Sequence, residues 1–102
     1  MFHHTNDAGS GIELVDATLR LWGEVDYRLA SGVADELEGQ LGRVRGTLLI
    51  DASDVTFMDS AGLALLVRSA TVTDSVVLVG ASEHVRGILE ATGVLALFDA
   101  DP

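Results

Sequence analysis

A serine and three carboxylates lie close together in the middle of the sequence, between two apolar segments. Ser60 follows Asp59 directly, and Asp51 and Asp54 lie a few residues earlier in "DASDVTFMDSAG". A hydroxyl in such a position has three possible roles, as a helix N-cap, a nucleophile or a site of phosphorylation. Each role requires different neighbours, so the rest of the chain distinguishes between them.

The simplest role is structural, since a serine at the start of a helix commonly accepts a backbone N–H bond and contributes about 1 kcal/mol. Ser82 is expected to cap a later helix in this way. A nucleophilic serine needs a general base, and the only histidine outside the N-terminal segment is His84, on another expected helix. The residues around Ser60 also lack the Gly-x-Ser-x-Gly pattern of hydrolases. A small hydrolase is therefore the weakest interpretation.

Phosphorylation fits the surroundings of Ser60 better. The modification adds a charge of about −1.5 to −2, and the free N–H groups at the start of a helix stabilise an anion. Phe57 and Met58 are expected to offer apolar surface beside the hydroxyl, and Gly62 to let another backbone approach the first helical turn. We expect the domain to tolerate a phosphate that a docked partner cannot accommodate.

The acids near Ser60 could also bind a metal ion. The spacing of Asp51, Asp54 and Asp59 matches no calcium-binding loop, so solvated carboxylates are the simpler interpretation. The "GSG" of residues 9–11 has no neighbouring lysine and precedes the first expected strand, unlike a phosphate-binding loop. No cofactor and no metal are therefore expected.

Hydrophobic periodicity predicts three helices that alternate with strands. The helices are expected over residues 26–41, 60–70 and 83–91. Each presents an apolar stripe, and the middle one is apolar almost all round, so it should be buried on more than one face.

The strands are expected over residues 12–22 (a hairpin), 47–50, 75–79 and 94–98 (a short strand or turn). Asp16-Ala17 can form the hairpin turn, and Gly23 is expected to end the hairpin. Residues 47–50 are continuously apolar, which predicts a strand covered on both faces. Residues 51–59 would then form a loop at its carboxyl end.

This order predicts a single α/β domain over residues 11–102, preceded by a flexible tail over residues 1–10. The sheet should be mainly parallel, with four to five strands, an N-terminal hairpin and three helices covering one face, joined by right-handed crossovers. The uncovered face leaves pairing with a second copy open.

Composition narrows the function. The 102 residues contain 16 acids against six arginines, and the net charge of −10 disfavours nucleic acid and anionic membranes as partners. A protein with a basic patch is favoured. No cysteine, no apolar run of about 20 residues and no signal-like start are present, which indicates a cytoplasmic protein.

The segment "LLIDASDVTFMDSAGLALLV" resembles the central signature of the STAS domain, which occurs in anti-sigma-factor antagonists and in the tails of sulfate transporters. "LWGEVD" and "VRGILEATGVLALF" are similar to further parts of that family, so only the first ten residues fall outside the resemblance. Ala61 stands where many relatives have a second hydroxyl, which leaves Ser60 as the one acceptor in this motif.

The resemblance implies a bacterial partner-switching protein that regulates transcription. An anti-sigma factor with serine kinase activity would phosphorylate Ser60 with its own ATP, the phosphorylated form would release that kinase, and a phosphatase would reset it. The resemblance assigns a role near the kinase to Asp26 and partner contact to Asp59 and Gly62. The residues expected to bind the partner are Asp26, Phe57, Met58, Asp59, Ala61, Gly62 and Leu63. The alternative is an adaptor subunit of a transport assembly that is not phosphorylated.

Overall fold

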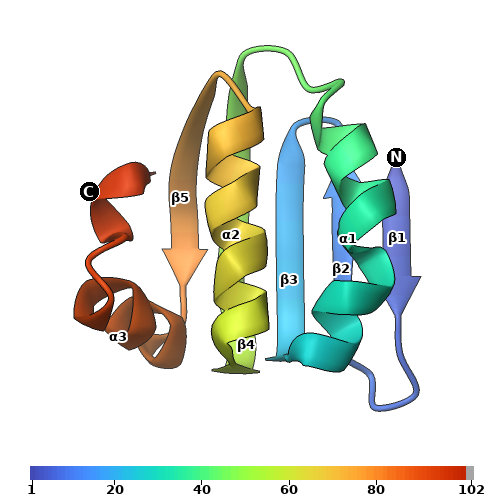
Figure 1. Ribbon diagram of the computed structural model, residues 1–102, viewed down its shortest axis with the longest axis vertical. Coiled ribbons are helices and arrows are strands. Elements are labelled where there is room, and N and C mark those ends of the chain that lie inside the picture. The colour runs from blue at the N-terminus through green and yellow to red at the C-terminus, as the bar shows by residue number, and fades with distance from the viewer. Residues whose placement is uncertain (101–102) are drawn as a thin grey trace.

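A β-sheet of six strands runs through the computed structural model, which describes residues 1–100 (Figure 1). The strands lie side by side in chain order: β1 (Phe2–Thr5), β2 (Gly11–Val15), β3 (Thr18–Val25), β4 (Thr47–Met58), β5 (Ser75–Ala81) and β6 (Asp99–Ala100). Strands β1 to β3 pair antiparallel and β3 to β6 pair parallel. The expected domain end at residue 102 lies outside the described residues.

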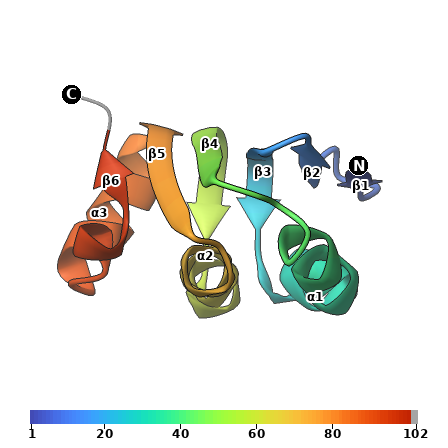
Figure 2. The same ribbon diagram turned by 90° about the horizontal axis from the view of Figure 1, so that it is seen from above.

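The helices α1 (Tyr27–Leu41), α2 (Ser60–Val72) and α3 (Glu83–Ala91) all cover the same face of the sheet (Figure 2). Each helix joins two neighbouring parallel strands, and every crossover steps in the same direction along the sheet. Because such crossovers are right-handed, the three helices must lie on one face. The predicted α/β class, hairpin and single helical layer are confirmed, and β1 and the two-residue β6 raise the strand count above the expected four to five.

The segment expected to be a loop, residues 51–59, is mostly strand, since β4 continues to Met58. Its pairing with β3 shifts twice, between Arg20 and Trp22 and between Gly23 and Glu24. Each shift inserts one extra residue in β4, which is the effect of a β-bulge. The buried positions of β4 therefore become three residues apart after Ala52, a spacing that period-two reading cannot recognise as strand.

The prediction that residues 47–50 are covered on both faces is wrong, because the helices cover only one face of β4. Leu48 and Ile50 are buried under the helices, whereas Leu49 is exposed on the opposite face. Val79 of β5 is likewise 43% exposed. Side chains alternate between the two faces of a strand, so a single helical layer covers only half of each run.

The first residues form a strand rather than the loose tail expected over residues 1–10. β1 pairs along its whole length with β2, and the side chain of Phe2 is only 6% exposed. The indole Nε1 of Trp22 donates a hydrogen bond to the carbonyl of Gly9 (2.9 Å), which fastens the β1–β2 connection to the sheet. The prediction of a flexible tail is therefore wrong for the residues of β1.

The remaining local predictions vary in outcome. The three helices lie where periodicity placed them, and Ser82 caps α3 by accepting the N–H of Val85. Gly23 does not end the hairpin, because β3 passes through it to Val25 with a positive φ of 77° at a bulge. Residues 94–98 contain a short 3₁₀ turn, η1 (Leu95–Leu97). None of the helices in the described part of the chain is long and apolar enough to cross a membrane.

Candidate functional site

Ser60 is the first residue of α2 and its side chain is exposed to solvent. The N-cap is the preceding residue, Asp59, whose Oδ1 accepts hydrogen bonds from the backbone N–H groups of Ala61 (2.9 Å) and Gly62 (3.1 Å). The structural role considered for the serine is thus filled by its neighbour. The hydroxyl of Ser60 is left at the surface, at the start of a helix and next to a carboxylate.

Asp59 also reaches the next helix. Its Oδ2 accepts the backbone N–H of Tyr27, the first residue of α1, at 2.9 Å. Partial burial by itself raises the pKa of Asp59, but the N–H donors of Gly62, Tyr27 and Ala61 outweigh it and hold the pKa below its usual value. The carboxylate is therefore charged at neutral pH and joins the starts of α1 and α2.

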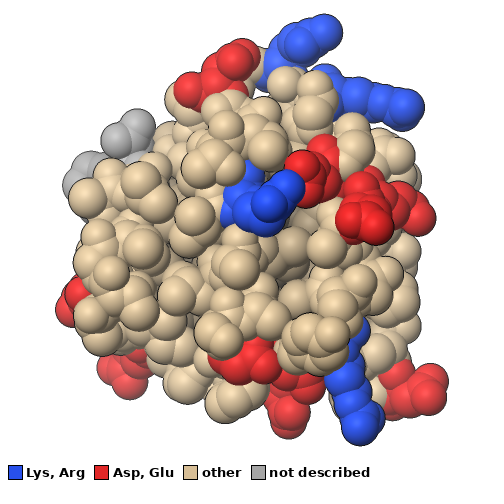
Figure 3. Space-filling model, in the orientation of Figure 1, with Lys and Arg blue, Asp and Glu red and all other residues tan. Residues whose placement is uncertain are grey.

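Asp26 lies beside Asp59 because of the strand register. Val25 of β3 pairs with Met58 of β4, so the residues that follow them, Asp26 and Asp59, leave the same edge of the sheet. Asp26 caps α1 by accepting the N–H of Leu29 (3.1 Å). Acidic side chains gather along this edge, where α1 and α2 begin (Figure 3). Ligands of α/β proteins bind at the carboxyl ends of parallel strands.

Met58 and Gly62 do not offer the surface that the sequence had indicated. Met58 is 2% exposed and packs inside the core. Gly62 is buried against β3: a Cβ atom built on it would lie 2.3 Å from the carbonyl oxygen of Val25 and 2.7 Å from Cγ of Met58. The close approach that glycine permits is to the protein's own backbone. Both residues therefore position α2, and the contact surface must come from their neighbours.

Phe57 does form part of the surface, and it has a partner that the sequence did not reveal. The residue is 44% exposed, and its ring lies against the ring of His84 from α3, with centroids 5.6 Å apart and planes inclined by 31°. Nε2 of His84 lies 3.4 Å from the carbonyl oxygen of Met58. These contacts hold the first turn of α3 against the end of β4, beside the turn that carries Ser60.

On the other side of this turn, an apolar groove separates the N-terminal halves of α1 and α2. It is lined by Tyr27, Ala30, Ser31, Ala34, Ala61, Ala64, Leu65 and Arg68. Ala61 is half-buried in this groove, and Tyr27 stands at its end with 68% of its surface exposed. Leu63, also expected to touch a partner, is half-buried and packs against the core.

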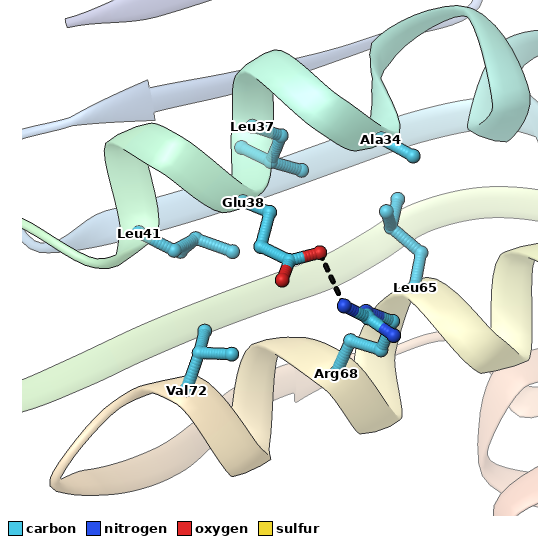
Figure 4. Close-up of a pocket in the computed structure, with 7 residues that line it drawn as sticks. All are labelled: Ala34, Leu37, Glu38, Leu41, Leu65, Arg68 and Val72. Carbon is cyan, nitrogen blue, oxygen red and sulfur yellow. Dashed lines mark hydrogen bonds and ion pairs between the residues drawn. The ribbon is translucent and has the colours of Figure 1, made fainter.

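Further along the same two helices, a smaller pocket lies between Leu37, Leu41, Leu65 and Val72 (Figure 4). Glu38 of α1 and Arg68 of α2 point toward one another there and form an ion pair. The pair is exposed, so it adds little to stability, about 0–1 kcal/mol. Arg68 lines both the groove and this smaller pocket, so the ion pair lies where the two adjoin.

The sequence analysis missed Tyr27 and His84. Tyr27 follows Asp26 at the start of the first helix, a position that predicts an exposed side chain. It gives no sign that the backbone N–H of Tyr27 bonds to Asp59 of the next helix. His84 was considered only as a base for Ser60, and its distance in sequence from Phe57 concealed the contact. Of the residues expected to bind a partner or to be phosphorylated, the structure places Asp26, Phe57, Asp59, Ser60 and Ala61 at one edge of the sheet.

The other two acids of the central segment face different partners. Oδ1 of Asp51 accepts the hydroxyl (2.6 Å) and the N–H (3.0 Å) of Ser53, and these two bonds lower its pKa against the effect of burial. Asp54 pairs with Arg20 at 2.9 Å. Within residues 1–100, no three side chains of the metal-ligating kinds gather in one place.

Comparison with known proteins identifies the architecture. The family model described as "Mlab, STAS domain" matches residues 9–98. No sequence among curated proteins matches the chain.

Solved structures share the fold at low sequence identity. The anti-sigma factor antagonist SpoIIAA in its unphosphorylated form has a TM-score of 0.68 and 20% identity, with 91% of this chain and 88% of that chain covered. The phosphorylated form of SpoIIAA, a cell fate determinant of Bacillus, has a TM-score of 0.62 and 18% identity, with 91% of each chain covered. A protein from Shewanella loihica with a SpoIIAA-like fold has a TM-score of 0.52 and 14% identity, covering 99% of this chain and 86% of that one.

Proposed function

The chain belongs to the STAS-domain family, and from this premise we propose that it is an anti-sigma-factor antagonist controlled by phosphorylation of Ser60. The observation that supports the proposal most directly is the position of Ser60. Its side chain is exposed at the first residue of α2, while Asp59 takes the cap that a structural serine would have supplied. An exposed hydroxyl that does not cap the helix is accessible to a kinase.

The partner in this proposal is an anti-sigma factor that is itself a serine kinase. It docks on the edge formed by Asp26, Phe57, Asp59, Ser60 and Ala61, where the acidic side chains suit a basic surface. The kinase transfers the γ-phosphoryl group of its own ATP to the Ser60 oxygen, the hydroxyl proton leaves, and ADP remains with the kinase. The domain therefore acts as a binding protein and a phosphate acceptor, not as an enzyme.

Phosphorylation then ends the complex. The phosphate adds a charge of about −1.5 to −2 at an edge that already carries two carboxylates, and it adds bulk in the middle of the docking surface. A surface that fits the kinase closely before the reaction cannot fit it afterwards. In the cytoplasm, a phosphatase that removes the phosphate restores binding, and sigma-factor release follows the unphosphorylated form.

Two variants test the switch. Ser60→Ala is expected to bind the kinase as the unmodified protein does and to stay bound in the presence of ATP. Ser60→Glu is expected to bind at least about tenfold more weakly, because a carboxylate reproduces part of the charge. Affinity measured by calorimetry checks both, with thermal unfolding as the control for folding. Equal affinities for the two variants would contradict a gate at Ser60.

Intact-mass measurement separates this function from that of an unphosphorylated adaptor. Incubation with the kinase and ATP should add one phosphate to the unmodified protein and none to Ser60→Ala. A transport adaptor would gain no phosphate with any candidate kinase and would bind its assembly equally well through both serine variants.

A further inference from the structure

Part of the backbone donor set at the start of α2 is already taken before any phosphate is added. Four N–H groups at the beginning of an α-helix normally lack a partner within the helix. In α2 the Asp59 side chain accepts two of these four, from Ala61 and Gly62, and the regular helical ladder begins with Leu63, whose N–H donates to the Asp59 carbonyl oxygen at 3.0 Å. The sequence-based expectation that free N–H groups would hold a phosphate on Ser60 therefore needs revision.

The same carboxylate connects this site to α1. Oδ1 of Asp59 binds the first turn of α2, and Oδ2 binds the N–H of Tyr27, the first residue of α1. A rotation of the carboxyl group that frees the N–H groups of Ala61 and Gly62 also changes the acceptor of Tyr27. The two helix starts are thus coupled through one side chain.

A phosphate on Ser60 would lie on the residue next to Asp59, a charged carboxylate. The repulsion between the two anions favours their separation, and both anions would compete for the N–H groups of Ala61 and Gly62, which Asp59 now holds. We propose that phosphorylation of Ser60 displaces the Asp59 carboxylate and thereby releases the N–H of Tyr27 at the start of α1. This inference rests on the proposed function for the modification itself, and it adds the route by which the modification reaches a second helix.

Phosphorylation would then change the partner-binding surface at two points, on α2 and on α1. Tyr27 is largely exposed and stands at the end of the apolar groove between α1 and α2. When its backbone loses the Asp59 acceptor, the first turn of α1 keeps the hydrogen bonds from Leu29 and Ala30 to Asp26 but loses its bond to α2. Phosphate on α2 then alters the aromatic anchor on α1 as well as the edge where it is attached. Asp59 is a positioning residue in this device.

The test uses protein with phosphoserine incorporated at position 60 during translation, so that no kinase is needed. The readout is water exchange of the Tyr27 amide by NMR, an unambiguous probe because Tyr27 is the only tyrosine. We expect exchange to become at least about tenfold faster on phosphorylation, as for an amide that loses a charged acceptor. The amides of Leu29 and Ala30, whose acceptors belong to Asp26, serve as internal controls and should keep their rates.

Asp59→Ser provides the matched variant. A serine can still cap α2, but it has one oxygen and a shorter side chain, so it leaves Tyr27 without its acceptor. The Tyr27 amide should exchange fast in this variant before phosphorylation, and phosphoserine at position 60 should add no further change. An unaltered Tyr27 rate in the phosphorylated protein with Asp59 present would overturn the coupling. Loss of kinase binding by that same protein would still support the proposed function, so the two failures are distinguishable.

Discussion

Phe57 at the end of β4 and His84 in the first turn of α3 lie ring against ring, with centroids 5.6 Å apart. The two residues come from opposite sides of α2 in the sequence, and both are exposed beside the turn that carries Ser60. Exposed aromatic rings held in place by a neighbour are favourable anchors for a partner, because little side-chain entropy remains to be lost on binding.

Replacement of Phe57 by alanine should therefore weaken kinase binding by about tenfold, which corresponds to roughly 1.4 kcal/mol. The free energy of unfolding of the domain should change by less than about 1 kcal/mol in Phe57→Ala, because much of the Phe57 side chain is already in water. Val79→Ala is the matched control, since Val79 is similarly exposed (43%) but lies on the open face of the sheet. Equal affinities for the two variants, measured by calorimetry, would remove Phe57 from the docking surface.

Gly62→Ala should destabilise the domain by about 2–3 kcal/mol, as overpacking of a closed contact does. The new Cβ atom would lie 2.3 Å from the carbonyl oxygen of Val25, and backbone must move to admit it. Gly32→Ala on α1 meets no atom within 4 Å and should be neutral or stabilising by up to about 1 kcal/mol, because alanine is the better helix former. Urea unfolding measures both changes, and similar stabilities for the two variants would contradict the close approach of α2 to β3.

The pH dependence of stability should report the hydrogen bonds of Asp59. Its pKa in the folded protein is below 3.8, the value without these contacts, so its contribution is fully present above pH 3.8 and is lost as pH falls through the lower, folded pKa. Asp59→Asn removes this titration. The stability difference between the unmodified protein and Asp59→Asn should be constant near neutral pH and shrink in acid. Thermal unfolding at a series of pH values checks this. A stability difference that stays constant into acid would show that these hydrogen bonds do not stabilise the charged carboxylate.

Phe2→Ala tests the N-terminal strand. The side chain is buried in the core, so its truncation should cost about 2–4 kcal/mol of unfolding free energy. His4→Ala, at an exposed position of the same strand, should change stability by less than about 0.5 kcal/mol. A loose tail would instead make both substitutions silent in urea unfolding, and that outcome would contradict the placement of β1.

Periodicity was enough to predict the helical layer of the fold. The apolar stripe of residues 26–41 recurs every four positions, and α1 spans Tyr27–Leu41. The apolar residues of α3 likewise marked Glu83–Ala91, with Ser82 as its cap. These features depend on neighbours within one or two turns, so the local sequence contains the information that determines them.

The strands were less predictable because their side-chain pattern depends on the neighbouring strand. The two register shifts against β3 change the spacing of buried residues in β4, which is why the segment predicted as a loop, residues 51–59, is strand as far as Met58. The polar start of β1 gave no strand signal, and only its pairing with β2 and the burial of Phe2 define it.

The sequence by itself determined which residues could act at the site: a serine that begins a helix after a strand, with acids and a phenylalanine before it. Only the tertiary structure decided what each of them does. Asp59 rather than Ser60 caps α2, Met58 and Gly62 are buried, and Tyr27 and His84 join the edge from 32 and 27 residues away from their contacts, Asp59 and Phe57. The reason is physical, since composition and spacing along the chain determine local preferences, whereas the contacts of a surface edge depend on how separate strands and helices end beside one another.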